Sequence, residues 1–435
     1  MHRFGIKPFY YFIDNHKFIF SSEINSLREF DNLGEITENK NALYNYFLYS
    51  RTDYDNTTFF NKICKLPSGY LFNLDKDSKF TTKKWYDLSK NLGNPFKSGA
   101  DFKQVLHSSI SLRMRSDVKV GSCLSGGIDS SSIVSVLLSK FDNLSTFSAI
   151  YDYDHRSNEA KYINEFEDKI SDMNYTYPTE HSLWKDLDDL FNTHAEPFST
   201  PAVYAQYKVM ELAKNKVTVL LNGQGADEYL AGYDYFYGFY LKELLSNFNI
   251  LKFLKESSYF YLKNKNQSHL KYLIYFLLPQ NLRDLLTLKK KQFIKNDFFR
   301  ENKKSTSFNQ LMYNSNSLTE SILNHFKYKL EHLLKWEDTN SMRFSLESRI
   351  PFLDHRLVEG TIGMNNEQKL SKGISKVILR NQLSEIIPKK ILSRTEKIGF
   401  DTPADYWFRS DKFITYINDI LNSNIIINSE ALNYK

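Results

Sequence analysis

The sequence is short of cysteine, proline and glycine, and each shortage excludes a class of protein. Its 435 residues include 2 cysteines, 10 prolines and 16 glycines. Cys64 and Cys123 form neither a CxxC pair nor a metal-ligand cluster, which excludes a disulfide scaffold and indicates a reducing compartment. The few prolines and glycines argue against long disordered linkers.

The chain also lacks the marks of a secreted, membrane or nucleic-acid-binding protein. Its opening, MHRFGIKPFYYF, is not a basic segment followed by a long apolar one, and the apolar run at 272–279 is too short to span a bilayer. The net charge of +6 comes from scattered lysines rather than one basic block. We therefore expect a cytoplasmic protein without membrane or nucleic-acid partners.

The most informative stretch is 118–132, VKVGSCLSGGIDSSS. Small apolar residues lead into a Ser-Gly-Gly break and an apolar-periodic run follows, which predicts a strand, a tight loop and a helix. Paired glycines let a ligand approach main-chain N–H groups, and the helix start favours phosphate oxygens. Asp129 would lie near a phosphate-bound cation, which favours a magnesium nucleotide as ligand. An ordinary strand-to-helix turn is the alternative.

The motif SGGIDSS resembles the PP-loop of the ATP pyrophosphatases, which hold the β,γ-pyrophosphate of ATP while the α-phosphate is attacked. The sequence has no GxxxxGK[ST] pattern, so the loop is not that of kinases and P-loop ATPases. The resemblance implies that ATP is bound by Leu124, Ser125, Gly126, Gly127, Asp129 and Ser130.

Strands and helices alternate after this loop. Predicted strands at 145–151, 175–179 and 217–221 are separated by helical stretches at 159–170 and 203–213. This alternation predicts an α/β fold with a parallel, doubly wound sheet and its ligand at the carboxyl ends of the strands. The resemblance implies the PP-loop ATP pyrophosphatase, or adenine nucleotide α-hydrolase-like, version of that fold. The stretch 233–335 is helix-prone and aromatic, and we interpret its aromatic residues as core.

A second glycine-bearing loop, LNGQGADEYLAGY, follows the strand at 217–221. If it meets the first loop at the sheet edge, Asp129 and Asp227 form a carboxylate pair that can share magnesium. The sequence alone equally allows Asp227 to cap the next helix. The segment is similar to the second nucleotide motif of asparagine synthetases, whose aspartate carries metal. The resemblance further implies that ATP is bound by Ala149, Asn222, Gly223 and Lys376.

Three residues are candidates for the chemistry. Asparagine synthetases commonly have glutamate where this chain has Gln224, and a neutral amide can orient a substrate but cannot accept its proton. The stretch DTNSMRFSLESRIPFLDHRLVE resembles a family segment between the two halves of the synthetase site, and its Glu347 could accept the proton instead. The segment SRTEKIGFDTPADYW resembles the family's lysine motif, which implies that Lys397 stabilises the adenylate and pyrophosphate. Without that resemblance the basic residues here would be a solvated face.

The opening segment is predicted to be β-rich, with strand pairs at 9–20 and at 62–74 around turns at 14–16 and 67–69. RFGIKPFYY, IFSSEINSL and KICKLPSGYLF are similar to the second half of the N-terminal-nucleophile glutaminase domain of glutamine-hydrolysing asparagine synthetases. In that family an N-terminal cysteine releases ammonia from glutamine, and His2 stands in its place here. We expect a truncated glutaminase-like half-domain at 1–90 without glutaminase activity, then a synthetase domain with a helical C-terminal part at 95–435.

These resemblances imply an ATP- and Mg²⁺-dependent ligase of the asparagine synthetase family. The side-chain carboxylate of aspartate would attack ATP to give a β-aspartyl-adenylate, and ammonia would displace AMP, giving asparagine, AMP and pyrophosphate. The nitrogen would come from ammonia or from a separate glutaminase chain, and a homodimer is also open. The alternatives are a related amidotransferase or β-lactam-forming synthetase acting on another carboxylate, and a degenerate nucleotide-binding subunit.

Overall fold

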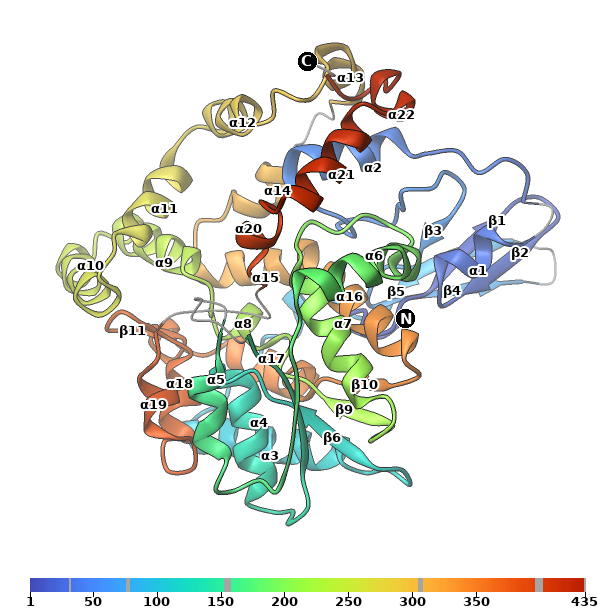
Figure 1. The fold of residues 1–435 in the computed structure, drawn as a ribbon. Helices are drawn as coiled ribbons and strands as arrows, with labels where there is room; N and C mark the ends of the chain where they lie inside the picture. The colour runs from blue at the N-terminus through green and yellow to red at the C-terminus, as the bar shows by residue number, and fades with distance from the viewer. Residues whose placement is uncertain (31–32, 76–78, 152–157, 304–307, 396–401, 434–435) are drawn as a thin grey trace.

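The computed structural model describes the chain except for residues 31–32, 76–78, 152–157, 304–307, 396–401 and 434–435 (Figure 1). Its central sheet has five strands in the order β10-β9-β6-β7-β8, and these strands pair in parallel. They are β6 (Val120–Cys123), β7 (Ser145–Ala149), β8 (Asp172–Thr176), β9 (Val219–Leu221) and β10 (Glu347–Arg349). The predicted parallel sheet is confirmed. Because the chain runs from β6 out to β8 and returns on the other side of β6, the topological switch point lies between β6 and β9.

Helices cover both faces of this sheet because successive strand residues point to opposite faces. On β9, Val219 and Leu221 share one core with α3 (Gly99–Arg113) and α4 (Ile128–Leu138). Leu220 instead shares a second core with α6 (Glu180–His194) and α7 (Ala202–Ala213). The sheet is thus covered on both sides, and its carboxyl edge is the place for a ligand.

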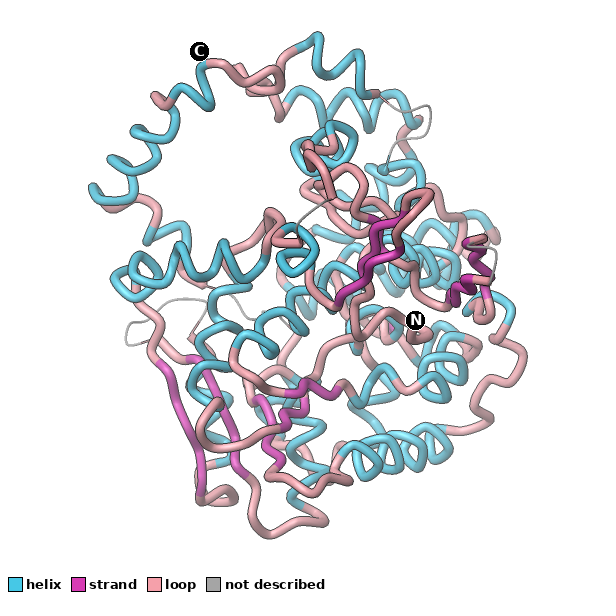
Figure 2. The backbone as a smooth tube through the Cα atoms, turned by 90° about the vertical axis from the view of Figure 1, so that its right-hand side faces the viewer, coloured by secondary structure: helices cyan, strands magenta, loops and turns pink. Residues whose placement is uncertain are grey.

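The stretch after β9 is helical, as the sequence predicts, and Figures 1 and 2 show part of it arching away from the sheet. Its aromatic residues pack on one another: the rings of Phe239 and Phe276 are stacked with centroids 3.8 Å apart. No helix in the described ranges is long and apolar enough to cross a membrane. The helices are α8 (Ala226–Tyr229), α9 (Tyr235–Ser246), α10 (Ile250–Asn264), α11 (Ser268–Leu277), α12 (Gln280–Lys289), α13 (Asn296–Asn302), α14 (Phe308–Tyr313), α15 (Leu318–Tyr328) and α16 (Leu330–Arg343).

The C-terminal part returns to the sheet and then crosses to the helical arch. Leu432 forms a β-bridge with Ile294, and the backbone N–H of Lys295 donates to Ala431, which attaches the end of the chain beside α13. The elements after β10 are η3 (Pro351–Leu353), α17 (His355–Ile362), η4 (Asn366–Gln368), β11 (Leu370–Ser371), β12 (Ile374–Ser375), α18 (Val377–Gln382), α19 (Lys389–Ser393), α20 (Ala404–Trp407), α21 (Asp411–Leu421) and α22 (Asn424–Ile427).

The N-terminal region contains β1 (Tyr10–Ile13), β2 (Phe18–Ser21), α1 (Ile24–Arg28), α2 (Lys40–Tyr49), β3 (Cys64–Lys65), β4 (Tyr70–Leu74), β5 (Phe80–Lys84) and η1 (Leu88–Lys90). The β1–β2 hairpin is confirmed. The strand pair expected around 67–69 is wrong, because β3 pairs with β1 and β4 pairs with β5. Gly69, at φ +71°, turns the chain so that its carbonyl accepts from Trp85 and Tyr86, which brings β5 rather than β3 beside β4.

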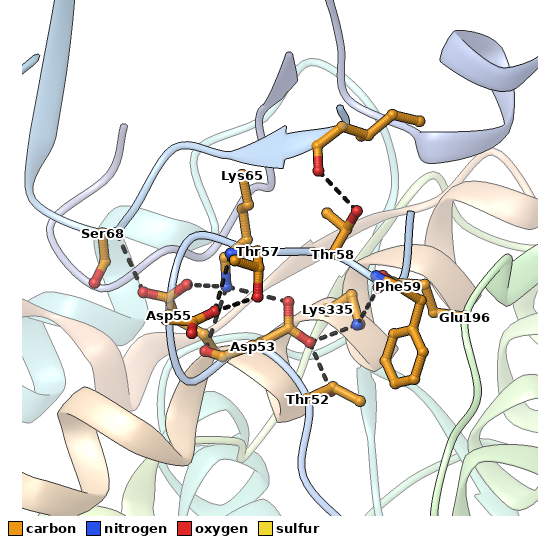
Figure 3. Close-up of polar contacts among 12 residues, drawn as sticks. Thr52, Asp53, Asp55, Thr57, Thr58, Phe59, Lys65, Ser68, Glu196 and Lys335 are labelled. Atoms are coloured by element: carbon orange, nitrogen blue, oxygen red, sulfur yellow. Dashed lines mark hydrogen bonds and ion pairs between the residues drawn. The ribbon is translucent and has the colours of Figure 1, made fainter. Parts of the chain in front are cut away.

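A buried ion network joins this region to α16 (Figure 3). Lys65 Nζ lies 3.1 Å from Asp53 and 2.6 Å from Glu331. Lys335 contacts Asp53 and lies 2.8 Å from Glu196. Burial acts to raise the pKa of Asp53, but Lys335 and Lys65 outweigh it and hold that pKa well below its usual range. The network therefore fastens the N-terminal strands to the helix that supports the candidate site.

Candidate functional site

The loop after β6 closes over the start of α4. Gly126 has φ +72°, and a Cβ on it would lie 2.8 Å from the Cβ of Tyr162, so glycine is required at this turn. Ser130 binds back to the loop, since its Oγ accepts from the N–H of Ser125 at 3.1 Å. Gly127 is the N-cap of α4 and offers no side chain to the first N–H groups of the helix. An anion can therefore be bound by these N–H groups at the positive end of the helix.

The loop after β9 packs against this first loop at the switch point. A Cβ on Gly223 would lie 3.0 Å from both the Cβ of Asp129 and the backbone nitrogen of Ser130, so the missing side chain lets the two loops touch. Gly225, at φ +90°, is the N-cap of α8, and a Cβ on it would strike the side chain of Leu353 at 2.5 Å. The structure thus brings together the two glycine-bearing loops that the sequence places at one sheet edge.

Asp129 and Asp227 meet at a buried lysine. Lys376 Nζ lies 2.7 and 2.6 Å from the two carboxylate oxygens of Asp129 and 2.6 Å from Oδ1 of Asp227. The lysine side chain is 3% exposed, and the two aspartates are 10% and 11% exposed. Gly232 makes room, because a Cβ there would lie 1.9 Å from Asp227 Oδ1 and 2.4 Å from Lys376 Cε. One cationic group therefore lies between the two carboxylates. Asp227 is not the N-cap of the next helix, because Gly225 is the N-cap of α8 and Asp234 is that of α9.

The same position suits a divalent metal. Magnesium takes one or two protein carboxylates together with substrate phosphates and waters. Within the described ranges, no group of three or more His, Cys, Asp or Glu residues could hold a metal by itself. Asp129 and Asp227 therefore supply the kind of oxygen ligands that suit magnesium arriving with a phosphate ligand, and in this structure Lys376 is the cationic group between them.

A buried carboxylate orients Asn222, the first residue after β9. The Asn222 Nδ2 donates to Glu337 Oε1 at 2.7 Å and Oε2 at 2.8 Å, and Glu337 also accepts from Gln206 and Ser348. Burial raises the pKa of Glu337, although these three donors oppose the shift. Sequence reasoning missed Glu337, since one acidic residue on a helix carries no signal of burial. Its contacts fix the direction of the Asn222 amide beside the glycine loop.

Leu124 and Ala149 lie at the carboxyl ends of the neighbouring strands β6 and β7. The Leu124 N–H donates to the carbonyl of Phe147 at 2.9 Å, and its carbonyl accepts from Ser148 Oγ at 2.6 Å. These bonds fasten the start of the loop to the end of β7, where Ala149 is half-buried. Both residues therefore flank the β6 loop.

Of the three residues considered for chemistry, the structure describes Gln224 and Glu347, and it does not bring these two together. Gln224 is half-buried in the β9 loop. Glu347 begins β10 opposite Val219, so it lies roughly 10 Å upstream of the loop edge at about 3.3 Å per strand residue. Its half-exposed carboxylate pairs with Arg349 at 2.8 Å, and that hydrogen bond lowers its pKa. Glu347 is therefore a poor base at this edge. Lys397 lies outside the described residues.

Comparison with known proteins gives two matches to families. The asparagine synthase family profile matches residues 101–434, and the glutamine amidotransferase domain profile matches residues 2–86. The chain is 28% identical to asparagine synthetase [glutamine-hydrolyzing] 1 of Bacillus subtilis over 94% of this chain and 66% of that protein. It is 32% identical to putative asparagine synthetase [glutamine-hydrolyzing] 2 of Methanocaldococcus jannaschii over 53% of this chain and 46% of that protein. It is 26% identical to asparagine synthetase [glutamine-hydrolyzing] 3 of Bacillus subtilis over 90% of this chain and 63% of that protein. The chain thus spans less than two thirds of the length of each of these relatives.

Proposed function

Since this chain belongs to the asparagine synthase family, we propose that it is an ATP-dependent ligase that forms an amide from a carboxylic acid and ammonia. One observation carries the proposal: two glycine loops at the switch point place Asp129 and Asp227 around a single cation position. We assign the ligase to residues 95–435 and a glutaminase-like region to residues 1–90.

Different residues bind different parts of the magnesium nucleotide. The loop from Leu124 to Ser130 acts as a PP-loop, in which the first N–H groups of α4 bind the β- and γ-phosphates. Asp129 and Asp227 would hold magnesium, which supplies positive charge that stabilises the departing pyrophosphate. Asn222, oriented by Glu337, offers its side-chain oxygen to the nucleotide or the acid.

The chemistry has two steps. A side-chain carboxylate, which we take to be that of aspartate, attacks the α-phosphate, so that an acyl-adenylate forms and pyrophosphate leaves. Ammonia then attacks the acyl carbon, AMP leaves, and asparagine is released after a proton is lost from the nitrogen. Lys397 would stabilise charge on the phosphates in both steps. Because Gln224 is neutral and Glu347 lies roughly 10 Å from the loop edge, we assign the proton that leaves the nitrogen to solvent or to the leaving AMP.

Ammonia is the proposed nitrogen source for this chain. A thiol acts as a nucleophile through its thiolate. Burial raises the pKa of Cys64 and of Cys123, so neither supplies a ready thiolate. The matched amidotransferase region therefore contributes structure to the ligase, and a separate glutaminase chain could supply ammonia to it.

ATP–pyrophosphate exchange tests the proposal. The purified chain, magnesium, ATP and radiolabelled pyrophosphate are mixed with aspartate or with other carboxylic acids. Label should enter ATP only when aspartate is present and should be lost in Asp129→Asn. Exchange with a different acid alone would assign another amide-forming or β-lactam-forming reaction, and ATP binding without exchange would indicate a nucleotide-binding subunit instead.

A further inference from the structure

A buried arginine lines a small pocket beside the β6 loop. The pocket is bordered by Gly127 and Ile128 at the start of α4, by Lys376, and by Arg380 and Arg394. It encloses about 30 Å³, which is room for about one water molecule. The pocket therefore lies between the N-terminus of α4 and the side chain of Arg394, which directly follows α19.

Arg394 is held on one side and has free donors on the other. Its side chain is 5% exposed, and its Nη1 lies 2.6 Å from Glu159 Oε1 and 3.3 Å from the carbonyl of Gly126. The guanidinium also lies over the ring of Tyr162, 4.3 Å from its centroid. Its Nε and Nη2 are buried and have no hydrogen-bond partner within the structure described. Buried donors normally have partners, so these two point to a ligand.

A neighbouring arginine differs in this respect. Arg380 donates to the carbonyls of Ser375 at 2.9 Å, Leu392 at 2.6 Å and Arg394 at 2.8 Å. All of these contacts are to main chain, so Arg380 positions the segment that carries Arg394. The structure thus provides one arginine that clamps the backbone and another that keeps two donors for the pocket.

We propose that Arg394 binds the pyrophosphate part of ATP and the pyrophosphate that leaves, through its Nε and Nη2. This inference rests on the proposed adenylate-forming function. A planar guanidinium presents two parallel donors that match two phosphate oxygens, whereas an ammonium acts as a point charge. The pocket holds only about 30 Å³, which is too small for pyrophosphate, and Lys376 is one of the residues that line it. The phosphates therefore enter as Lys376 moves away from Asp129 and Asp227. Arg394 then faces the anion with both free donors.

The test measures binding of inorganic pyrophosphate with magnesium, and separately of adenosine, by calorimetry on the full chain. Arg394→Gln should weaken pyrophosphate binding by about tenfold or more and leave adenosine binding within about twofold. Arg394→Lys, which keeps the charge but not the fork, should fall between Arg394→Gln and wild type. Arg343→Gln is the matched control, because Arg343 pairs with Asp189 at 2.8 Å on an exposed surface.

Unchanged pyrophosphate affinity in Arg394→Gln would overturn the proposal, and so would equal losses for pyrophosphate and adenosine together with a lower melting temperature. If Arg394→Gln does not fold, Arg394→Lys decides: pyrophosphate affinity equal to wild type overturns the proposal. Pyrophosphate exchange separates this result from the wider one. Exchange by wild type with no effect of the Arg394 variants refutes the inference alone, whereas wild type that binds neither ATP nor pyrophosphate refutes the proposed function as well.

Discussion

Lys376 should compete with magnesium for Asp129 and Asp227. In the structure its ammonium lies 2.6 Å from Asp227 and 2.6 Å from the nearer oxygen of Asp129, with all three side chains buried or nearly so. A metal can bind between these carboxylates only if the lysine leaves. The nucleotide-free protein should therefore bind magnesium weakly, and Lys376→Met, which keeps the length but removes the charge, should bind it more tightly.

The magnitude follows from the contacts that the metal must break. A hydrogen bond to a charged group contributes about 1.5–3 kcal/mol, and Lys376 makes such contacts to two carboxylates. If the displaced ammonium recovers half of the total elsewhere, about 1.5–3 kcal/mol remains as the cost of displacement. Since about 1.4 kcal/mol is a factor of ten, Lys376→Met should bind magnesium roughly 10- to 150-fold more tightly.

The assay is titration of nucleotide-free protein with Mn²⁺ by electron paramagnetic resonance, or with Mg²⁺ by calorimetry. The metal should also raise the melting temperature of Lys376→Met more than that of wild type, because two buried carboxylates without a cation repel each other. Lys369→Met is the matched control: Lys369 is equally buried but donates to the main-chain carbonyls of Thr361, Ile362 and Met364. Metal affinity in Lys376→Met that equals or falls below wild type would refute the competition.

Three further predictions concern the two carboxylates themselves, Lys369 and the two cysteines. Asp129→Asn and Asp227→Asn should each abolish pyrophosphate exchange, and the double variant should be no worse than either, because the two act on one cation; mild additive losses would contradict this. Burial lowers the pKa of Lys369 to about 8, so the unfolded chain binds more protons between about pH 8 and 10.4, and the free energy of unfolding should rise across that range. Denaturant titrations should show a smaller rise in Lys369→Met, and equal slopes would exclude Lys369 as the cause. Ammonium should support asparagine formation while glutamine releases no glutamate, because Cys64 and Cys123 are poor nucleophiles; glutamate release by the purified chain would refute this.

The first glycine loop could be predicted because its signals are local. The small apolar strand, the paired glycines and the periodic run after Ile128 lie within one stretch, and β6 and α4 form there. Alternation of strands and helices likewise predicted the parallel sheet. The strand boundaries were less accurate, since β8 occupies Asp172–Thr176 rather than 175–179 and ends before Pro178, which cannot donate to a sheet.

Other parts of the site have no local signal. Strand β10 consists of Glu347, Ser348 and Arg349, and it pairs with β9 at the edge of the sheet. A run of three residues with two charges does not predict a strand. The sequence therefore suggested Glu347 as a base without showing that it starts this strand. Lys376 follows Asp129 by 247 residues, and its position between the carboxylates depends on tertiary packing, because Lys376 is the N-cap of α18 and α18 packs against α3.

Buried charges explain how the site can fold without its ligand. An ion taken out of water costs several kcal/mol unless a partner compensates it. Here the Lys376 ammonium lies between Asp129 and Asp227, and Glu159 partners Arg394, so each of these three carboxylates faces a cationic group within the chain. Binding of a magnesium nucleotide would exchange these partners: the metal would replace Lys376 at the carboxylates, and phosphate oxygens would take the donors of Lys376 and Arg394. The affinity for the nucleotide is then a difference between two sets of ion pairs. Loss of the lysine should therefore strengthen the binding of metal alone and weaken the binding of pyrophosphate, and this opposite pair of effects distinguishes an exchange of partners from damage to the fold.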